Sequence, residues 1–126
     1  MSSEAKKFLY ILTTGPEVSY GAASPFFLAT TAALMDHDVS MVFTIRATQL
    51  LKHGVAEELT VKEGGDGARL QFFIDQAREA GVKFYVCAPS LDLNDCTLED
   101  LIETEGVVGG SAVNDMALES QVVISF

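Results

Sequence analysis

Cys87 is the residue of this 126-residue sequence best placed to act as a nucleophile. It follows the apolar run Val82 to Val86 and is followed directly by Ala88-Pro89-Ser90. Such a run predicts a buried strand, so the thiol falls at the carboxyl end of that strand. N–H groups of a turn at that point can stabilise the thiolate, which is the nucleophilic form of cysteine. The pattern predicts a reactive Cys87, with simple packing as the alternative, because free cysteines are often buried.

Further candidate binding residues lie at other chain turns of the expected fold. Ligands of open parallel sheets bind beyond the carboxyl ends of the strands. Three segments meet that description: Thr14-Gly15-Pro16, Thr44 to Thr48, and Cys87-Ala88-Pro89-Ser90. Gly109-Gly110-Ser111 precedes an expected helix whose first N–H groups can hold a small anion such as thiosulfate, or can simply turn the chain. The residues we expect to bind substrate are Thr14, Gly15, Ser90 and Gly110.

The remaining titratable residues suggest neither a metal nor a cofactor. Cys96 is a second thiol, which can resolve an oxidised or persulfidated Cys87 or be a partly buried bystander. His37 and His53 share no ligand spacing with the cysteines, so we expect no zinc site. The sequence contains neither G-x-G-x-x-G nor the phosphate-binding P-loop, and we expect no cofactor.

The charge of the chain restricts its partners. A formal net charge of -10 argues against nucleic acid, which requires a basic surface. Residues 84–126 contain eight Asp and Glu and no Lys or Arg, and nearby carboxylates disfavour a thiolate. Activation of Cys87 then needs backbone dipoles, or a basic residue from another segment or subunit.

The location expected for the chain is cytoplasmic. No run approaches the roughly 20 apolar residues of a membrane span, and the first residues lack a signal-peptide pattern. Two cysteines in such a chain are expected to be reduced thiols rather than a structural bridge.

Strand and helix patterns alternate along the chain, which predicts one α/β domain over residues 1–126. Alternation of this kind favours a mostly parallel sheet of four or five strands in a three-layer sandwich. The loop from Gly54 to Asp66 precedes a helix that Asp66 can cap, and Ser111 can cap the last helix. The expected strands are Phe8 to Thr13, Val39 to Thr44, Val82 to Val86, Val107-Val108 and Gln121 to Ser125, and the expected helices include Ala47 to Lys52 and a short one opened by Thr97-x-x-Asp100.

Several segments together resemble the DsrE/DsrF-like family. They are Thr13-Thr14-Gly15-Pro16-Glu17, Pro25-Phe26-Phe27-Leu28-Ala29, Phe84-Tyr85-Val86-Cys87-Ala88-Pro89-Ser90-Leu91-Asp92, Thr97 to Ile102 and Val107-Val108-Gly109-Gly110. The resemblance covers nearly the whole chain and rests on order and spacing. It implies a flavodoxin-like fold, assembly into trimers or hexamers, and a role in intracellular sulfur trafficking. It also implies that Cys87 carries a persulfide and exchanges sulfur with the thiols of partner proteins, although Cys96 is not part of the family pattern.

The leading hypothesis is therefore a sulfur carrier or sulfurtransferase-like protein acting through Cys87. Ser90 and the N–H groups after Cys87 are expected to steady the terminal sulfur. Two alternatives remain open: an oligomeric, non-catalytic module that binds a small ligand in the strand-end cleft, and a thiol redox protein that forms a Cys87–Cys96 disulfide. The disulfide requires Cα atoms within about 7 Å.

Overall fold

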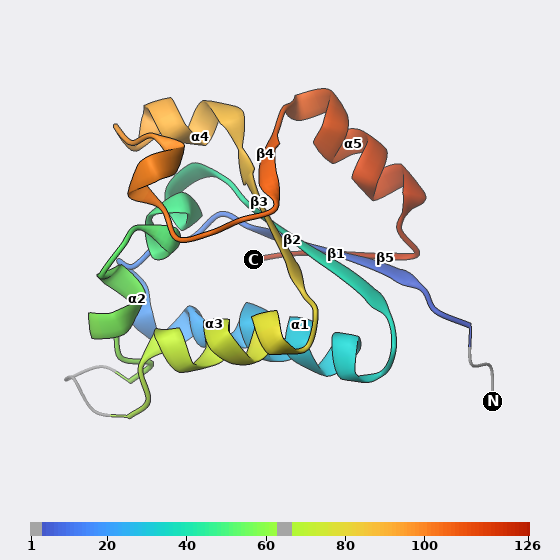
Figure 1. Ribbon diagram of the computed structural model, residues 1–126, viewed down its shortest axis with the longest axis horizontal. Helices are drawn as coiled ribbons and strands as arrows, with labels where there is room; N and C mark the ends of the chain where they lie inside the picture. The colour runs from blue at the N-terminus through green and yellow to red at the C-terminus, as the bar shows by residue number, and fades with distance from the viewer. Residues whose placement is uncertain (1–3, 63–66) are drawn as a thin grey trace.

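Five parallel strands form the centre of the molecule (Figure 1). The computed structural model describes residues 4–62 and 67–126. The strand order in the sheet is β4-β3-β2-β1-β5, and every adjacent pair is parallel. The strands are β1 (Lys7–Leu12), β2 (Asp38–Phe43), β3 (Lys83–Cys87), β4 (Gly106–Val108) and β5 (Val122–Ser125).

Helices lie on both faces of this sheet, as expected for parallel strands joined by crossovers. α1 (Ala23–Leu34) and α3 (Leu70–Glu79) pack against each other on one face, and α5 (Gly110–Glu119) lies on the other (Figure 1). The shorter helices are α2 (Val55–Glu58), α4 (Ala88–Leu93) and the 3₁₀ segments η1 (Ser19–Gly21), η2 (Ile45–Leu51) and η4 (Leu98–Asp100). The predicted three-layer α/β fold is therefore confirmed. Within the described ranges, no helix is long and apolar enough to cross a membrane.

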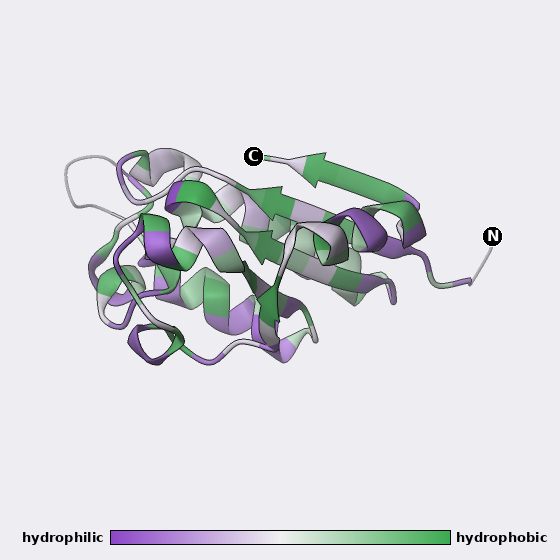
Figure 2. Ribbon diagram, turned by 90° about the horizontal axis from the view of Figure 1, so that it is seen from above, coloured by the Kyte–Doolittle hydropathy of each residue, from purple (hydrophilic) through white to green (hydrophobic). Residues whose placement is uncertain are grey.

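The main core lies between the sheet and the α1–α3 layer. Phe26, Phe43 and Phe84 are fully buried there, with ring centroids 5.4 to 5.8 Å apart. These distances suit favourable tilted and edge-to-face aromatic packing. The strand ribbons are largely hydrophobic in Figure 2, whereas the helices alternate in character. The aromatic cluster thus fixes β2 and β3, which end at the candidate site.

The strands agree with the sequence expectations, but several short elements differ. α4 occupies residues expected to form only a turn after Cys87, and α2 lies within the expected 54–66 loop. The last helix is capped by Gly109 rather than by Ser111, because the helix already begins at Gly110. Asp66 lies outside the described residues, and α3 begins at Leu70 with Arg69 as its N-cap.

Candidate functional site

Cys87 lies where β3 ends and α4 begins. It is the last residue of the strand and also the N-cap of the helix, with extended φ and ψ of -72° and 126°. Pro89 in the first turn suits a helix start, because that turn needs no N–H donor from it. Cys87 is half-buried and its thiol is free. Strand alternation puts its side chain on the same sheet face as Tyr85 and Lys83, which is the α5 face.

The buried hydroxyl groups of Ser90 and Thr48 hold the backbone of Cys87 in place. The Ser90 hydroxyl donates to the Cys87 carbonyl oxygen at 2.6 Å, and it lies 2.7 Å from the Thr48 Oγ1 atom. Thr48 is fully buried and Ser90 is 2% exposed. Buried hydroxyls without partners are costly, so this pair rigidly joins α4 to η2. Ser90 therefore fixes the backbone at the thiol, and its hydroxyl already has partners within the protein.

Asn94 extends this network to the end of β2. Its amide nitrogen donates to the carbonyl oxygens of Ser90 at 2.6 Å and Ile45 at 2.7 Å. Its amide oxygen accepts a longer hydrogen bond, of 3.4 Å, from Arg46 Nη1. Ile45 has a positive φ of 53°, which is strained for a β-branched residue and costs on the order of 1–3 kcal/mol. The Asn94 bond to the Ile45 carbonyl helps to hold this conformation.

The N-terminus of α5 lies beside Cys87 at the same sheet edge. Cys87 is in register with Val108, and α5 begins two residues later at Gly110. The N-cap Gly109 has no side chain to satisfy the N–H groups of the first turn, which also contains no acidic residue. A methyl group added at Gly110 would meet no atom of the described residues within 4 Å. The positive end of the helix dipole is thus open to solvent close to the thiol.

Thr14 and Gly15 lie two strands away from Cys87, after β1. Gly15 is buried, and its N–H donates to Glu17 Oε1 at 3.0 Å. A Cβ at Gly15 would lie 2.5 Å from the Arg46 carbonyl oxygen, so the position requires glycine. Thr14 lines a separate apolar hollow of about 240 Å³, together with Leu12, Val18, Gly21, Ala22, Pro25, Leu50 and Phe126. The structure thus puts Ser90 against the Cys87 backbone and Gly110 two residues beyond Val108, the register partner of Cys87, whereas Thr14 lines another pocket.

Cys96 lies beyond α4 and packs against the hydrophobic core. Burial raises the pKa of the Cys96 thiol; Asp100 and Asp95 add to this increase, and Lys52 opposes it. From Cys87 to the C-cap Asn94 the helix rises about 10 Å. Cys96 folds back beside the last turn of the helix, where its N–H donates to the Leu91 carbonyl oxygen at 3.0 Å, whereas Cys87 lies at the start of the helix.

The histidines occupy separate places. His37 stacks on Phe8 with 4.9 Å between ring centroids, and its Nδ1 accepts the Lys6 backbone N–H at 3.0 Å. In residues 4–62 and 67–126, no three His, Cys, Asp or Glu side chains converge as a metal site would require. The described donors therefore give no ligand set for a metal.

Sequence reasoning placed Thr48 in the strand-end segment Thr44 to Thr48 without giving it a role, and it missed Asn94. Thr48 lies 42 residues from Ser90, and Asn94 lies 49 residues from Ile45. No local spacing connects such pairs, because parallel crossovers bring them together only in the folded chain. The one available indication of these contacts was that β2 and β3 end at the same sheet edge, so the segment after β2 begins near Cys87.

The fold and the strand-end cysteine define an α/β protein with a parallel sheet and an accessible thiol at its carboxyl edge. The DsrE/DsrF-like family matches the chain over residues 6–126, so the chain belongs to that family. This membership associates the chain with sulfur relay. No curated protein matches the chain in sequence.

Two solved structures share the fold. The ychN protein from E. coli superposes with a TM-score of 0.77 at 15% identity, covering 96% of this chain and 99% of that one. MTH1491 from Methanobacterium thermoautotrophicum, described as a protein of unknown function, gives a TM-score of 0.64 at 15% identity. That match covers 98% of this chain and 100% of the other. At such low identity these likenesses concern the fold alone.

Proposed function

We propose that the chain is a sulfur carrier in which Cys87 forms a persulfide and passes the sulfur to a partner thiol. The observation that supports this most directly is the half-buried Cys87 at the end of β3, beside the open N-terminus of α5. Membership of the DsrE/DsrF-like family supports the same chemistry. Backbone dipoles supply positive potential that the acidic C-terminal third does not.

The transfer is a pair of thiol exchange steps. The Cys87 thiolate attacks the outer sulfur of a persulfide R–S–SH, a new S–S bond forms, and R–S⁻ leaves, giving Cys87–S–SH. An acceptor thiolate then attacks the terminal sulfur of Cys87–S–SH, and the Cys87 thiolate is restored. The sulfane sulfur moves without net oxidation, so these steps use no cofactor.

The surrounding residues take distinct roles in this proposal. Ser90 and Thr48 fix the backbone at Cys87, while the first N–H groups of α5, beginning at Gly110, hold the anionic sulfur. Gly15 keeps the neighbouring β1 loop close to the segment after β2. The donors and acceptors include thiols of partner proteins in the cytoplasm, and the carrier acts as a homo-oligomer, a trimer or hexamer.

Intact-protein mass spectrometry after brief exposure to polysulfide tests the assignment. Wild type should gain a mass of one or more sulfur atoms that reductant removes, and Cys87→Ser should gain none at that site. Cys96→Ser is the matched control and should load like wild type. Loading that persists in Cys87→Ser and disappears in Cys96→Ser would transfer the role to the other thiol.

A second candidate function is a non-catalytic module that binds a small ligand. The 240 Å³ apolar hollow favours it, because Leu12 and Phe126 put the hollow where β1 and β5 end. Chain order in the sheet changes direction between β1 and β5, and such switch points are common ligand sites. This alternative predicts that Cys87 reacts slowly with alkylating agents and gains no sulfur.

The third alternative is a redox protein with a Cys87–Cys96 disulfide. It requires the Cα atoms of Cys87 and Cys96 to come within about 7 Å, although α4 lies between the two residues in the chain. Counting free thiols after mild oxidation, with and without reductant, distinguishes it from the other two: only a disulfide removes both thiols reversibly from the same molecule.

A further inference from the structure

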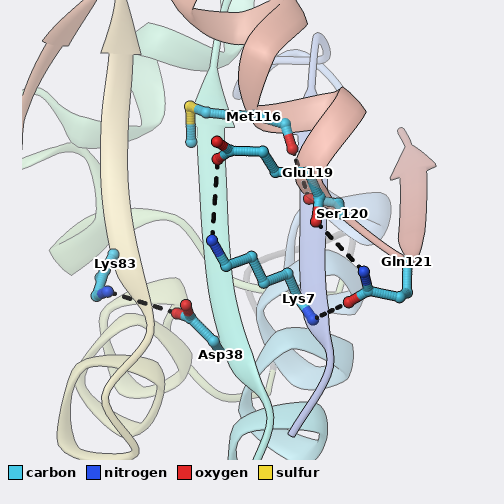
Figure 3. Close-up of polar contacts among 7 residues, drawn as sticks. All are labelled: Lys7, Asp38, Lys83, Met116, Glu119, Ser120 and Gln121. Carbon is cyan, nitrogen blue, oxygen red and sulfur yellow. Dashed lines mark hydrogen bonds and ion pairs between the residues drawn. The ribbon is translucent and has the colours of Figure 1, made fainter.

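A second, polar pocket lies at the opposite end of the sheet from the carboxyl edge. It has a volume of about 180 Å³ and lies between the C-terminal part of α5 and the first residues of β1, β2 and β3. Its polar lining consists of Lys7, Asp38, Ser40, Lys83, Tyr85, Glu119 and Ser120. Figure 3 shows Lys7 extending toward Glu119 and Lys83 toward Asp38, with Met116 above them.

The charged groups of this pocket are paired only weakly. Lys7 Nζ lies 3.8 Å from Glu119 Oε2, and Lys83 Nζ lies 3.4 Å from Asp38 Oδ1. All four side chains are about half-exposed or more, and exposed pairs of this kind contribute about 0–1 kcal/mol. Each of these charged groups can therefore exchange its present partner for a ligand group at little cost in free energy. Two ammonium groups and two carboxylates together suit a ligand that carries both charges.

The spacing of the cations selects the size of the ligand. Lys7 and Lys83 lie on β1 and β3, on either side of β2. Lys7 is in register with Asp38 and Lys83 with Ser40, so their Cα atoms are offset by two residues and lie about 12 Å apart. A free amino acid is too short to span this distance, whereas a small peptide has the necessary length.

Strand alternation connects this pocket to the reactive thiol. Lys83, Tyr85 and Cys87 follow one another on the same face of β3, so the Cα atoms of Lys83 and Cys87 lie about 13 Å apart. Tyr85 and Cys87 are both half-buried rather than covered. In Figure 3 the first part of β3 runs alongside α5 rather than beneath it. A peptide bound by one charged end at Lys83 can thus extend along β3 toward the Cys87 sulfur.

We propose that this pocket recognises the charged ends of a low-molecular-weight peptide thiol, whose persulfide is the sulfur donor to Cys87. The inference rests on the proposed carrier function and specifies its donor class. The donor thiol is a zwitterionic peptide persulfide R–S–SH. The Cys87 thiolate takes its outer sulfur, and the peptide leaves as R–S⁻, so atoms and electrons balance.

The rate at which Cys87 is loaded with sulfur tests this inference with two donors. Glutathione persulfide is the peptide donor, and inorganic polysulfide is the donor that lacks the charged ends of a peptide. The variants are Lys83→Met, Lys7→Met and, as the control, Lys62→Met, an exposed lysine outside the pocket. Loading from glutathione persulfide should fall at least five-fold in the two pocket variants and stay unchanged in Lys62→Met. Loading from polysulfide should be equal in all. Pocket variants that load as fast as wild type from glutathione persulfide would overturn the inference.

A binding measurement separates failure of this inference from failure of the carrier function. S-methylglutathione cannot transfer sulfur, so its binding does not depend on the chemistry of Cys87. In NMR titrations of wild type it should shift the amide signals of Lys7, Lys83 and Tyr85, and Lys83→Met should abolish the shifts. Absence of shifts in wild type would refute the peptide site. Shifts without sulfur loading from either donor would retain the site and refute the carrier function.

Discussion

At the scale of single residues, the surroundings of Cys87 include groups that the sequence does not place beside it. Its type and its strand-end position could be predicted, because an apolar run ending in Ala-Pro-Ser is visible locally. Ser90 was expected to steady a sulfur atom. In the structure its hydroxyl donates to the Cys87 carbonyl oxygen and lies within hydrogen-bond distance of Thr48. The strand-end segment that contains Thr48 could be predicted, but its pairing with Ser90 could not, since the two residues are 42 positions apart in the chain.

The Cys96 thiol should ionise at a higher pH than an ordinary cysteine thiol, because its pKa is raised. Burial raises its pKa, so the pH profile of iodoacetamide alkylation, measured in Cys87→Ser, should have its midpoint above the ordinary thiol value of about 8.5. Lys52→Met should move that midpoint further up, because the Lys52 charge lowers the pKa. A midpoint at or below 8.5 would contradict the burial of the thiol.

The same shift has a consequence for stability. The folded state keeps the Cys96 proton to higher pH than the unfolded state, so the stabilisation is present below pH 8.5 and is lost as pH rises through the folded pKa. Wild type should therefore lose stability between pH 8 and pH 10 more steeply than Cys96→Ala, by urea midpoints measured across that range. Parallel curves for the two proteins would show that the thiol does not contribute.

At the scale of elements, the strands and the short helices at 45–51 and 98–100 were predictable, whereas α2 and α4 were not. Apolar runs such as Val82 to Val86 fix a strand by themselves, and strand–helix alternation then implies parallel pairing. α4 has six residues including Pro89 and Ser90, a composition equally typical of a turn. Its helical form is supported by its own C-cap Asn94, whose amide binds the carbonyl oxygens of Ser90 and Ile45, and by Thr48 of η2, which lies within hydrogen-bond distance of the Ser90 hydroxyl. The position of β5 beside β1 likewise follows from tertiary packing rather than from any local pattern.

Two glycines at the sheet edge should respond oppositely to the same added methyl group. Gly15→Ala puts a Cβ 2.5 Å from the Arg46 carbonyl oxygen, so we expect a loss of about 1–3 kcal/mol in the free energy of unfolding. Gly110→Ala meets open space on a helix and should stabilise by up to about 1 kcal/mol. Urea denaturation at neutral pH measures both. Equal effects of the two substitutions would mean that the β1 loop does not pack against the segment after β2.

At the scale of the whole molecule, the strongly negative charge restricts how copies of the chain can associate. With a net charge of -10, two copies repel each other unless they meet through an uncharged surface. Residues 18–35 contain no Asp, Glu, Lys or Arg, and this segment includes all of α1. The outward side of α1 exposes large apolar side chains at helical spacing: Phe27, Leu28, Leu34 and Met35. A helix that is apolar on all sides is usually buried, so the exposed face of α1 suits contact with a second copy of the chain.

A charge on that face should dissociate the proposed homo-oligomer. Phe27 is 60% exposed, so Phe27→Glu leaves the monomer core intact while putting like charges against each other across the contact. Light scattering at micromolar concentration should give a multiple of the 13.5 kDa chain mass for wild type and a lower mass for Phe27→Glu. Leu118→Glu adds the same charge on α5, at a residue 84% exposed on the opposite face of the sheet, and should keep the wild-type mass. A monomeric wild type would exclude the oligomer, and dissociation by Leu118→Glu alone would move the contact to the α5 face. Because the α1 face lies across the sheet from Cys87, assembly through it leaves the thiol open to sulfur donors and acceptors.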